Sequence, residues 1–208
     1  MDSSTVFFGN HESGHSYKVA LLLALARIPH RYRWIDLELP REARPADFRA
    51  ASRFGEVPVL VWQGRAYCQS NAILLSLAEQ HPQWWGGDAA AAREWLCWEA
   101  NRIGFSVPNL RFARHWSPQP PAVMAWLEAR ARADLQTLDE ALAGRDFLLG
   151  DEPSIADLSC CGYLFWLEQA GLDAADLPHL QAWLARIAGL PAWQAPYDLL
   201  KKKEESQA

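Results

Sequence analysis

The chain has 208 residues, half of them hydrophobic, and a formal net charge of −5 at pH 7. This length suits one large or two small domains with a sizeable core, and the acidic balance disfavours general nucleic-acid binding, which needs a basic face. No apolar run reaches the roughly 18 residues that span a bilayer and residues 1–5 lack a secretory pattern, so we expect a cytoplasmic protein that binds neither nucleic acid nor membrane.

The first 81 residues alternate strand and helix patterns. The expected elements are strands at residues 5–8, 32–37, 59–62 and 65–68, helices at 16–28 and 70–79, and a loop over 40–56 with a helical turn at 46–51. Strand, helix and strand make a parallel crossover, and the hairpin adds antiparallel strands to the same sheet. The order therefore predicts an α/β thioredoxin-like domain.

Only helical patterns follow. Residues 82–89 contain chain breakers and no periodicity, which predicts a linker. The expected helices are residues 90–116, with a kink near Gly104 and Pro108, and residues 122–142, 154–170 and 177–188. We therefore expect a thioredoxin-like domain over residues 1–81 and an all-α helical C-terminal domain over residues 90–208.

The four cysteines, Cys68, Cys97, Cys160 and Cys161, form no Cys-x-x-Cys pair and lack the spacing of a zinc site. In a reducing compartment such thiols are typically buried and unpaired. We expect no metal site.

Two short motifs flank the predicted hairpin. Val57-Pro58 precedes it, and an extended, exposed backbone at Val57 can pair with a peptide as an added strand. Gln69-Ser70 follows it and opens the next helix, where Ser70 can act as the N-cap. The free N–H groups and partial positive charge of a first helical turn also attract a carboxylate.

In this order and spacing, Val57-Pro58, Gln69-Ser70 and the apolar helix behind them resemble the glutathione-binding segment of the glutathione transferase superfamily. The resemblance implies a cis bond between Val57 and Pro58. It also implies that Val57 pairs with the backbone of glutathione, and that Ser70, supported by Gln69, binds the γ-glutamyl carboxylate. Glutathione would be a co-substrate.

The glutathione thiol needs activation, because a thiol with a pKa of about 8.5 is mostly protonated at neutral pH. Residues 13–19 lead into the first helix and resemble a segment of zeta, theta and related bacterial transferases, whose first serine faces the sulfur and corresponds to Ser13. Both Ser13 and Ser16 can cap the helix. We expect Ser16 to be the cap and Ser13 the thiolate partner, with His15 as a weaker candidate.

The resemblance implies further contacts. Arg41, Arg44 and Arg53 are candidates for the glycine end of glutathione, and Glu99 would complete the γ-glutamyl site of a second subunit in a homodimer. A pocket for the electrophile is expected on the helix after the linker, where the aromatic residues can equally be core; its candidates are Asn101, Phe105, Arg111, Phe112, His115 and Trp116. Ser154 and Asp157 match a capping motif with a structural role.

The resemblance implies a detoxifying transferase that conjugates the glutathione thiolate to a small hydrophobic electrophile. Residues 13–16 contain no cysteine, which disfavours mixed-disulfide chemistry through the enzyme and also a zeta-like isomerase. A glutathione-dependent disulfide or peroxide reductase remains an alternative, as does a non-catalytic protein with the transferase fold.

Overall fold

A four-stranded mixed sheet forms the first part of the computed structural model, which describes residues 5–202. The strands are β1 (Val6–Gly9), β2 (Arg31–Trp34), β3 (Val59–Trp62) and β4 (Arg65–Cys68), in the order β2-β1-β3-β4. β1 and β2 are parallel, whereas β3 is antiparallel to both β1 and β4. The predicted crossover and hairpin are therefore confirmed.

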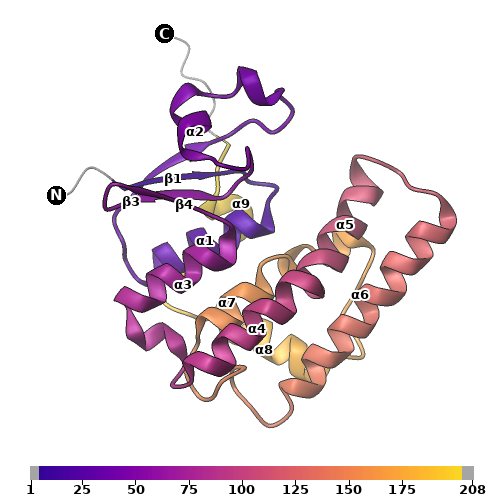
Figure 1. Ribbon diagram of the computed structural model, residues 1–208. Helices are drawn as coiled ribbons and strands as arrows, with labels where there is room; N and C mark the ends of the chain where they lie inside the picture. Colours follow the sequence, from indigo (N-terminus) through magenta and orange to yellow (C-terminus); the bar gives the residue numbers. More distant parts are fainter. Residues whose placement is uncertain (1–4, 203–208) are drawn as a thin grey trace.

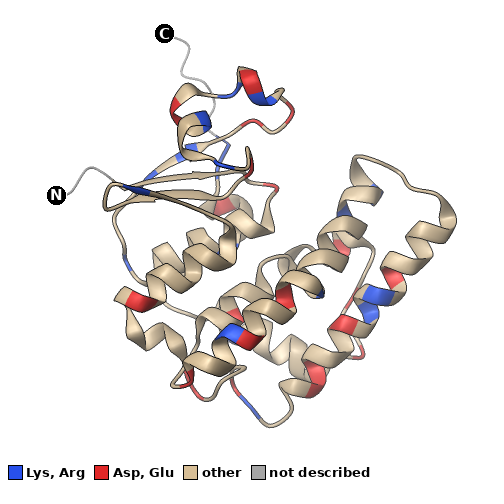
Figure 2. Cartoon of the chain, viewed as in Figure 1, with Lys and Arg blue, Asp and Glu red and all other residues tan. Residues whose placement is uncertain are grey.

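Helices cover both faces of this sheet (Figure 1). α1 (Gly14–Leu25) and α3 (Ser70–Gln80) lie on one face, and the short α2 (Ala46–Ala51) lies on the other. Neighbouring strand residues point to opposite faces: Phe8 packs with Phe48 of α2, whereas Phe7 joins the larger cluster that contains α1 and α3. The segment between β2 and β3, which also holds η1 (Arg41–Ala43), carries charges of both signs (Figure 2).

The rest of the chain is helical. In order, it contains η2 (Pro82–Trp85), α4 (Ala89–Asn101), α5 (Ile103–His115), α6 (Pro121–Ala141), α7 (Ile155–Cys161), η3 (Leu164–Trp166), η4 (Glu168–Ala170), α8 (Pro178–Ala188) and α9 (Pro196–Leu199). The protein thus has the expected fold class, a thioredoxin-like α/β part followed by an all-α part. The domain limits at residues 81 and 90 stay a prediction, and residues 1–4 and 203–208 lie outside the described part.

One hydrophobic core continues from the sheet into the helical part. α7 packs against α1, α3 and α4, so α1 is covered by the sheet on one side and by α7 on the other. This double cover buries nine consecutive or near-consecutive positions of α1, including Lys18. A charged group at such a position needs an oppositely charged or hydrogen-bonding partner. The partners of Lys18 lie beside the cleft that is described below.

Two predicted helices are interrupted. The helix expected over residues 90–116 breaks at Arg102, where φ is −117° and ψ is −104°. Pro108 does not end the second helix, because α5 continues through it. The Glu99 carboxylate lies against Gly104 at this break. The helix expected over residues 154–170 ends at Cys161 and continues only as short 3₁₀ segments. The Ser154–Asp157 capping box is confirmed: Ser154 N–H donates to Asp157 Oδ2 over 2.9 Å.

Burial of the cysteines follows the expectation only in part. Cys160 and Cys161 are buried, Cys68 is half-buried, and Cys97 is exposed on α4. The expectation was wrong for Cys97 because it lies on a side of α4 that nothing within the described residues covers. No helix between residues 5 and 202 combines the length and the apolar character that a membrane crossing requires.

Candidate functional site

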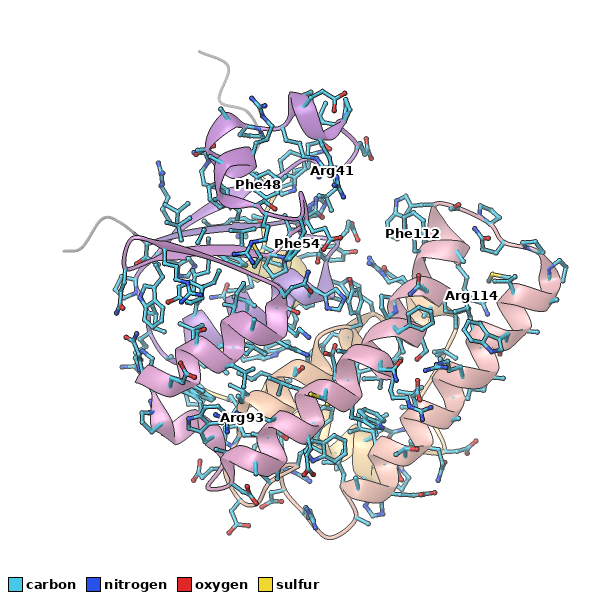
Figure 3. All side chains as sticks on the ribbon, in the orientation of Figure 1. Arg41, Phe48, Phe54, Arg93, Phe112 and Arg114 are labelled. Carbon is cyan, nitrogen blue, oxygen red and sulfur yellow. The ribbon has the colours of Figure 1, made fainter. Side chains whose placement is uncertain are left out.

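A cleft of about 1100 Å³ lies between the sheet part and the helical part. The start of α1, the loop before β3 and the start of α3 form one side, and α4 and α5 form the other. Figure 3 shows Arg41 and Phe54 on the first side and Phe112 of α5 across from them. The candidate residues that line the cleft are Ser13, His15, Arg41, Arg44, Val57, Pro58, Gln69, Ser70, Glu99, Arg111, Phe112 and Trp116.

Three candidates for the electrophile pocket lie elsewhere, so these predictions were wrong. Asn101 is exposed and its carbonyl accepts from Arg130; the Phe105 ring packs against Trp126 of α6; His115 contacts the Gln169 carbonyl. The cleft-facing stripe of α5 instead contains Gly104, Pro108, Arg111 and Phe112. Because successive helix residues are rotated by about 100°, Phe105 points away from this stripe.

The loop before β3 presents a free backbone to the cleft. The Val57–Pro58 bond is cis, as expected. Ser52 Oγ donates to the Glu56 carbonyl over 2.9 Å and accepts from the Glu56 N–H over 3.0 Å, which fixes the residue before Val57. Within the described residues, neither the N–H nor the C=O of Val57 has a hydrogen-bond partner. Val57 can therefore pair with an extended ligand backbone.

The start of α3 differs from the expectation. Gln69 is the N-cap, with φ of +70° and no side-chain capping bond, and Ser70 is the first helical residue. The prediction of Ser70 as N-cap was wrong. Ser70 is 8% exposed, and its hydroxyl has no partner among residues 5–202. A left-handed φ at a residue other than glycine costs about 1–3 kcal/mol and is typical of ligand clamps. Ser70 is thus available to a ligand.

The start of α1 also differs. Ser13 is the N-cap, because its Oγ accepts from the Ser16 N–H over 3.1 Å. Ser16 is fully buried inside the helix and accepts from the Asn10 N–H over 3.2 Å, so its prediction as the cap was wrong. The turn at Asn10 starts the helix early, since the Asn10 carbonyl accepts from the Ser13 N–H. The Ser13 hydroxyl faces the cleft as an acceptor whose own proton can be donated.

His15 cannot act as a cation or an efficient base at neutral pH. Its pKa is lowered from 6.5 to about 4, mainly by burial and also by the Lys18 charge, while Glu99 opposes the shift. Its Nδ1 has no hydrogen-bond partner in the described part of the chain. The imidazole is therefore neutral at pH 7, and a base with so low a pKa is poorly matched to a thiol.

A buried ion pair joins the two parts beside the cleft. Lys18 Nζ lies 2.9 Å from Glu99 Oε2 and 2.7 Å from Asn71 Oδ1. Asn71 Nδ2 donates to Glu99 over 2.8 Å, and Ser159 Oγ lies 3.2 Å from the same carboxylate. Burial raises the pKa of Glu99, but Lys18 and the other partners outweigh it, so that the pKa is lowered.

The expectation that Glu99 faces a second subunit was wrong. Glu99 is 2% exposed and its carboxylate is occupied by its own chain. Lys18, Asn71 and Ser159 could not be recognised as its partners from the sequence. The one local signal was a lysine in the middle of an apolar helix, which does not reveal its partner.

The arginine candidates fall into two groups. Arg44 donates to the carbonyls of Leu37, Leu39 and Gly55, so it supports the loop. Arg53 lies outside the cleft against Phe54, contrary to its expected role. Arg41 lines the cleft and forms no ion pair within the described part. Among the three, Arg41 best suits a carboxylate of a ligand.

Arg111 is buried and links the two parts instead of offering a free charge. It donates to the carbonyl of Glu12 over 2.8 Å, to the Glu12 carboxylate, and to Gln169 Oε1 over 2.8 Å. Beyond it, the exposed rings of Phe112 and Trp116 stack with centroids 5.8 Å apart. They form an apolar wall opposite the loop before β3.

Acidic, histidine and cysteine side chains do not gather into a metal-binding group of three or more within residues 5–202. The functional groups of the cleft are a free backbone at Val57, hydroxyls at two helix starts, a cation at Arg41 and an aromatic wall. They suit a peptide-like ligand with carboxylates and a neighbouring apolar molecule.

Comparison with known proteins agrees with this arrangement. Residues 12–80 match the family described as glutathione S-transferase, N-terminal domain, and residues 127–186 match glutathione S-transferase, C-terminal domain. The disulfide-bond oxidoreductase YfcG of Escherichia coli is 27% identical over 90% of this chain and 91% of its own length.

Two solved structures show the same fold. A glutathione S-transferase from Xanthobacter autotrophicus has a TM-score of 0.82 and 31% identity, over 94% of this chain and 98% of its own. A glutathione transferase from Burkholderia graminis, with two glutathione molecules bound per subunit, has a TM-score of 0.81 at 21% identity, over 98% of this chain and 90% of its own. The chain belongs to the glutathione S-transferase family.

Proposed function

We propose that the protein binds glutathione in the cleft and conjugates its thiolate to a small hydrophobic electrophile. The observation that carries this proposal is the convergence of three polar groups on the cleft. The Val57 backbone and the Ser70 hydroxyl have no partner within the described residues, and the Ser13 hydroxyl caps α1 but keeps a proton that it can donate. Val57 pairs with the peptide backbone, and Ser70 with the first turn of α3 binds the γ-glutamyl carboxylate. Gln69 supports this end, and Arg41 binds the glycine carboxylate.

In this proposal the protein provides orientation and electrostatics, and glutathione provides the nucleophile. The thiol loses its proton to solvent, and the Ser13 hydroxyl donates to the resulting thiolate. The sulfur then forms a bond to the electrophilic carbon, and the leaving group departs with its electron pair. Phe112 and Trp116 offer the apolar surface on which such an electrophile packs.

A second candidate is glutathione-dependent disulfide reduction. The name of the Escherichia coli relative favours it, and the Burkholderia protein holds two glutathione molecules per subunit. Two glutathione molecules would reduce one disulfide to two thiols and leave as glutathione disulfide. Without a cysteine at positions 13–16, all the sulfur atoms that react would come from the two glutathione molecules and the disulfide substrate.

The two candidates are separated by their substrates. We would compare conjugation of chlorodinitrobenzene with reduction of hydroxyethyl disulfide, using the same protein and the same glutathione concentration. Conjugation is expected to be the faster reaction. A protein that binds glutathione but catalyses neither reaction would contradict both candidates and favour the non-catalytic alternative.

The role of Ser13 needs a variant that preserves the helix cap. Ser13→Ala removes both hydroxyl and cap, whereas Ser13→Gly removes the hydroxyl at a position where glycine caps nearly as well. Both are expected to lower kcat/KM about 10- to 100-fold, since a hydrogen bond to an ionised group contributes about 1.5–3 kcal/mol. Ser76→Ala, on α3 outside the cleft, is the matched control. Wild-type conjugation by Ser13→Gly would exclude Ser13 as the thiolate partner.

We also propose a homodimer, which rests on family membership, and a cytoplasmic location, which was expected from the sequence. Light scattering of the purified protein tests the first, with a mass near twice 23.4 kDa as the expected result.

A further inference from the structure

Tyr163, which the sequence analysis did not single out, lies at the start of α1 although it belongs to the helical part. The backbones at Gly14 and Gly162 touch: a Cβ on Gly14 would lie 2.5 Å from the Gly162 carbonyl oxygen, and one on Gly162 would lie 2.9 Å from the Gly14 oxygen. Two glycines therefore permit a contact that any side chain would block. As a result, the Tyr163 ring lies directly against the first residue of α1.

Tyr163 lies on the same side of the cleft as Ser13, at the start of α1. Burial raises the pKa of Tyr163, and the Ser13 hydroxyl, the Arg111 guanidinium and the N–H groups of Gly14 and His15 lie near enough to oppose that shift in part. Because the net pKa is raised, the phenol keeps its proton at neutral pH. Tyr163 and Ser13 both line the cleft.

Both hydroxyls are in the correct state to donate. Ser13 Oγ already accepts from the Ser16 N–H, and the raised pKa of Tyr163 keeps its phenol protonated. Each hydroxyl therefore carries a proton that it can donate to an acceptor. A thiolate is such an acceptor, and the first turn of α1 adds partial positive charge.

We propose that Tyr163 is a second catalytic hydroxyl, which donates to the glutathione sulfur together with Ser13. This inference rests on the proposed function and extends it, since the thiolate would be held by one hydroxyl from each part of the chain. The contact between Gly14 and Gly162 then becomes a requirement for catalysis, because it sets the distance between the two hydroxyls.

The test measures the thiol pKa of bound glutathione from the ultraviolet absorbance of the thiolate as pH is varied. Tyr163→Phe keeps the ring against Gly14 and removes only the hydroxyl. It is expected to raise the thiol pKa by about one unit, as Ser13→Gly also should, and the double variant should raise it further. Tyr32→Phe is the matched control, because it removes a buried phenol hydroxyl that has no partner within the described residues and lies outside the cleft.

The outcomes separate the two proposals. If wild-type protein binds no glutathione or leaves its thiol pKa at the free value, the proposed function and this inference both fail. If the wild type lowers the thiol pKa and Tyr163→Phe lowers it equally, only the role of Tyr163 is overturned. A loss of thermal stability in Tyr163→Phe with an unchanged thiol pKa would likewise overturn it, since that is the behaviour of a helix cap.

Discussion

Replacing Ser70 by alanine should weaken glutathione binding while leaving the fold intact. The Ser70 hydroxyl is nearly buried and has no partner among the described residues, and Gln69, not Ser70, is the N-cap of α3. A hydrogen bond to a carboxylate contributes about 1.5–3 kcal/mol, so the dissociation constant should rise about 10- to 100-fold. Because no internal hydrogen bond is lost, the free energy of unfolding should change by less than about 0.5 kcal/mol.

Isothermal titration calorimetry measures the affinity, and urea denaturation measures the stability. Ser76→Ala, on the same helix outside the cleft, should change neither. Ser154→Ala removes a true N-cap and should cost about 0.5–2 kcal/mol of stability. Unchanged affinity in Ser70→Ala would refute the placement of the γ-glutamyl group, and a stability loss similar to that of Ser154→Ala would refute the view that Ser70 is not a cap.

Two further predictions concern the buried groups beside the cleft. Lys18→Met should lower the free energy of unfolding by about 3–5 kcal/mol, because it leaves the Glu99 carboxylate buried without its cation. In urea denaturation, the double variant with Glu99→Leu should recover much of this loss. A cost below about 1 kcal/mol for the single variant would contradict the reasoning. His15 binds its proton less readily in the folded state, so stability should fall by about 3 kcal/mol as pH drops from 6.5 to about 4. His15→Gln should lack that part of the pH dependence in thermal unfolding, and an identical pH profile would refute it.

The features that local sequence predicted correctly act through neighbours a few positions away. The hairpin and the Ser154–Asp157 capping box of α7 accordingly lie where expected. The cis bond at Val57–Pro58 is also present, but it was expected from the family resemblance and not from the local sequence. The prediction of Ser16 as the N-cap of α1 was wrong because a turn at Asn10 starts the helix three residues earlier. In this turn the Asn10 side chain accepts from the Glu12 N–H, and the Asn10 carbonyl accepts from the Ser13 N–H.

The sequence by itself determined the fold class and the order of the elements, because periodicity and turn residues express short-range preferences. Only the tertiary structure decided which side chains meet in the cleft and beside it. Lys18 and Ser159 are 141 positions apart, and the Tyr163 ring meets Gly14 only because two glycines let α1 and the end of α7 touch. Such contacts depend on how the helical part covers α1, and no pattern within a single helix records what covers it.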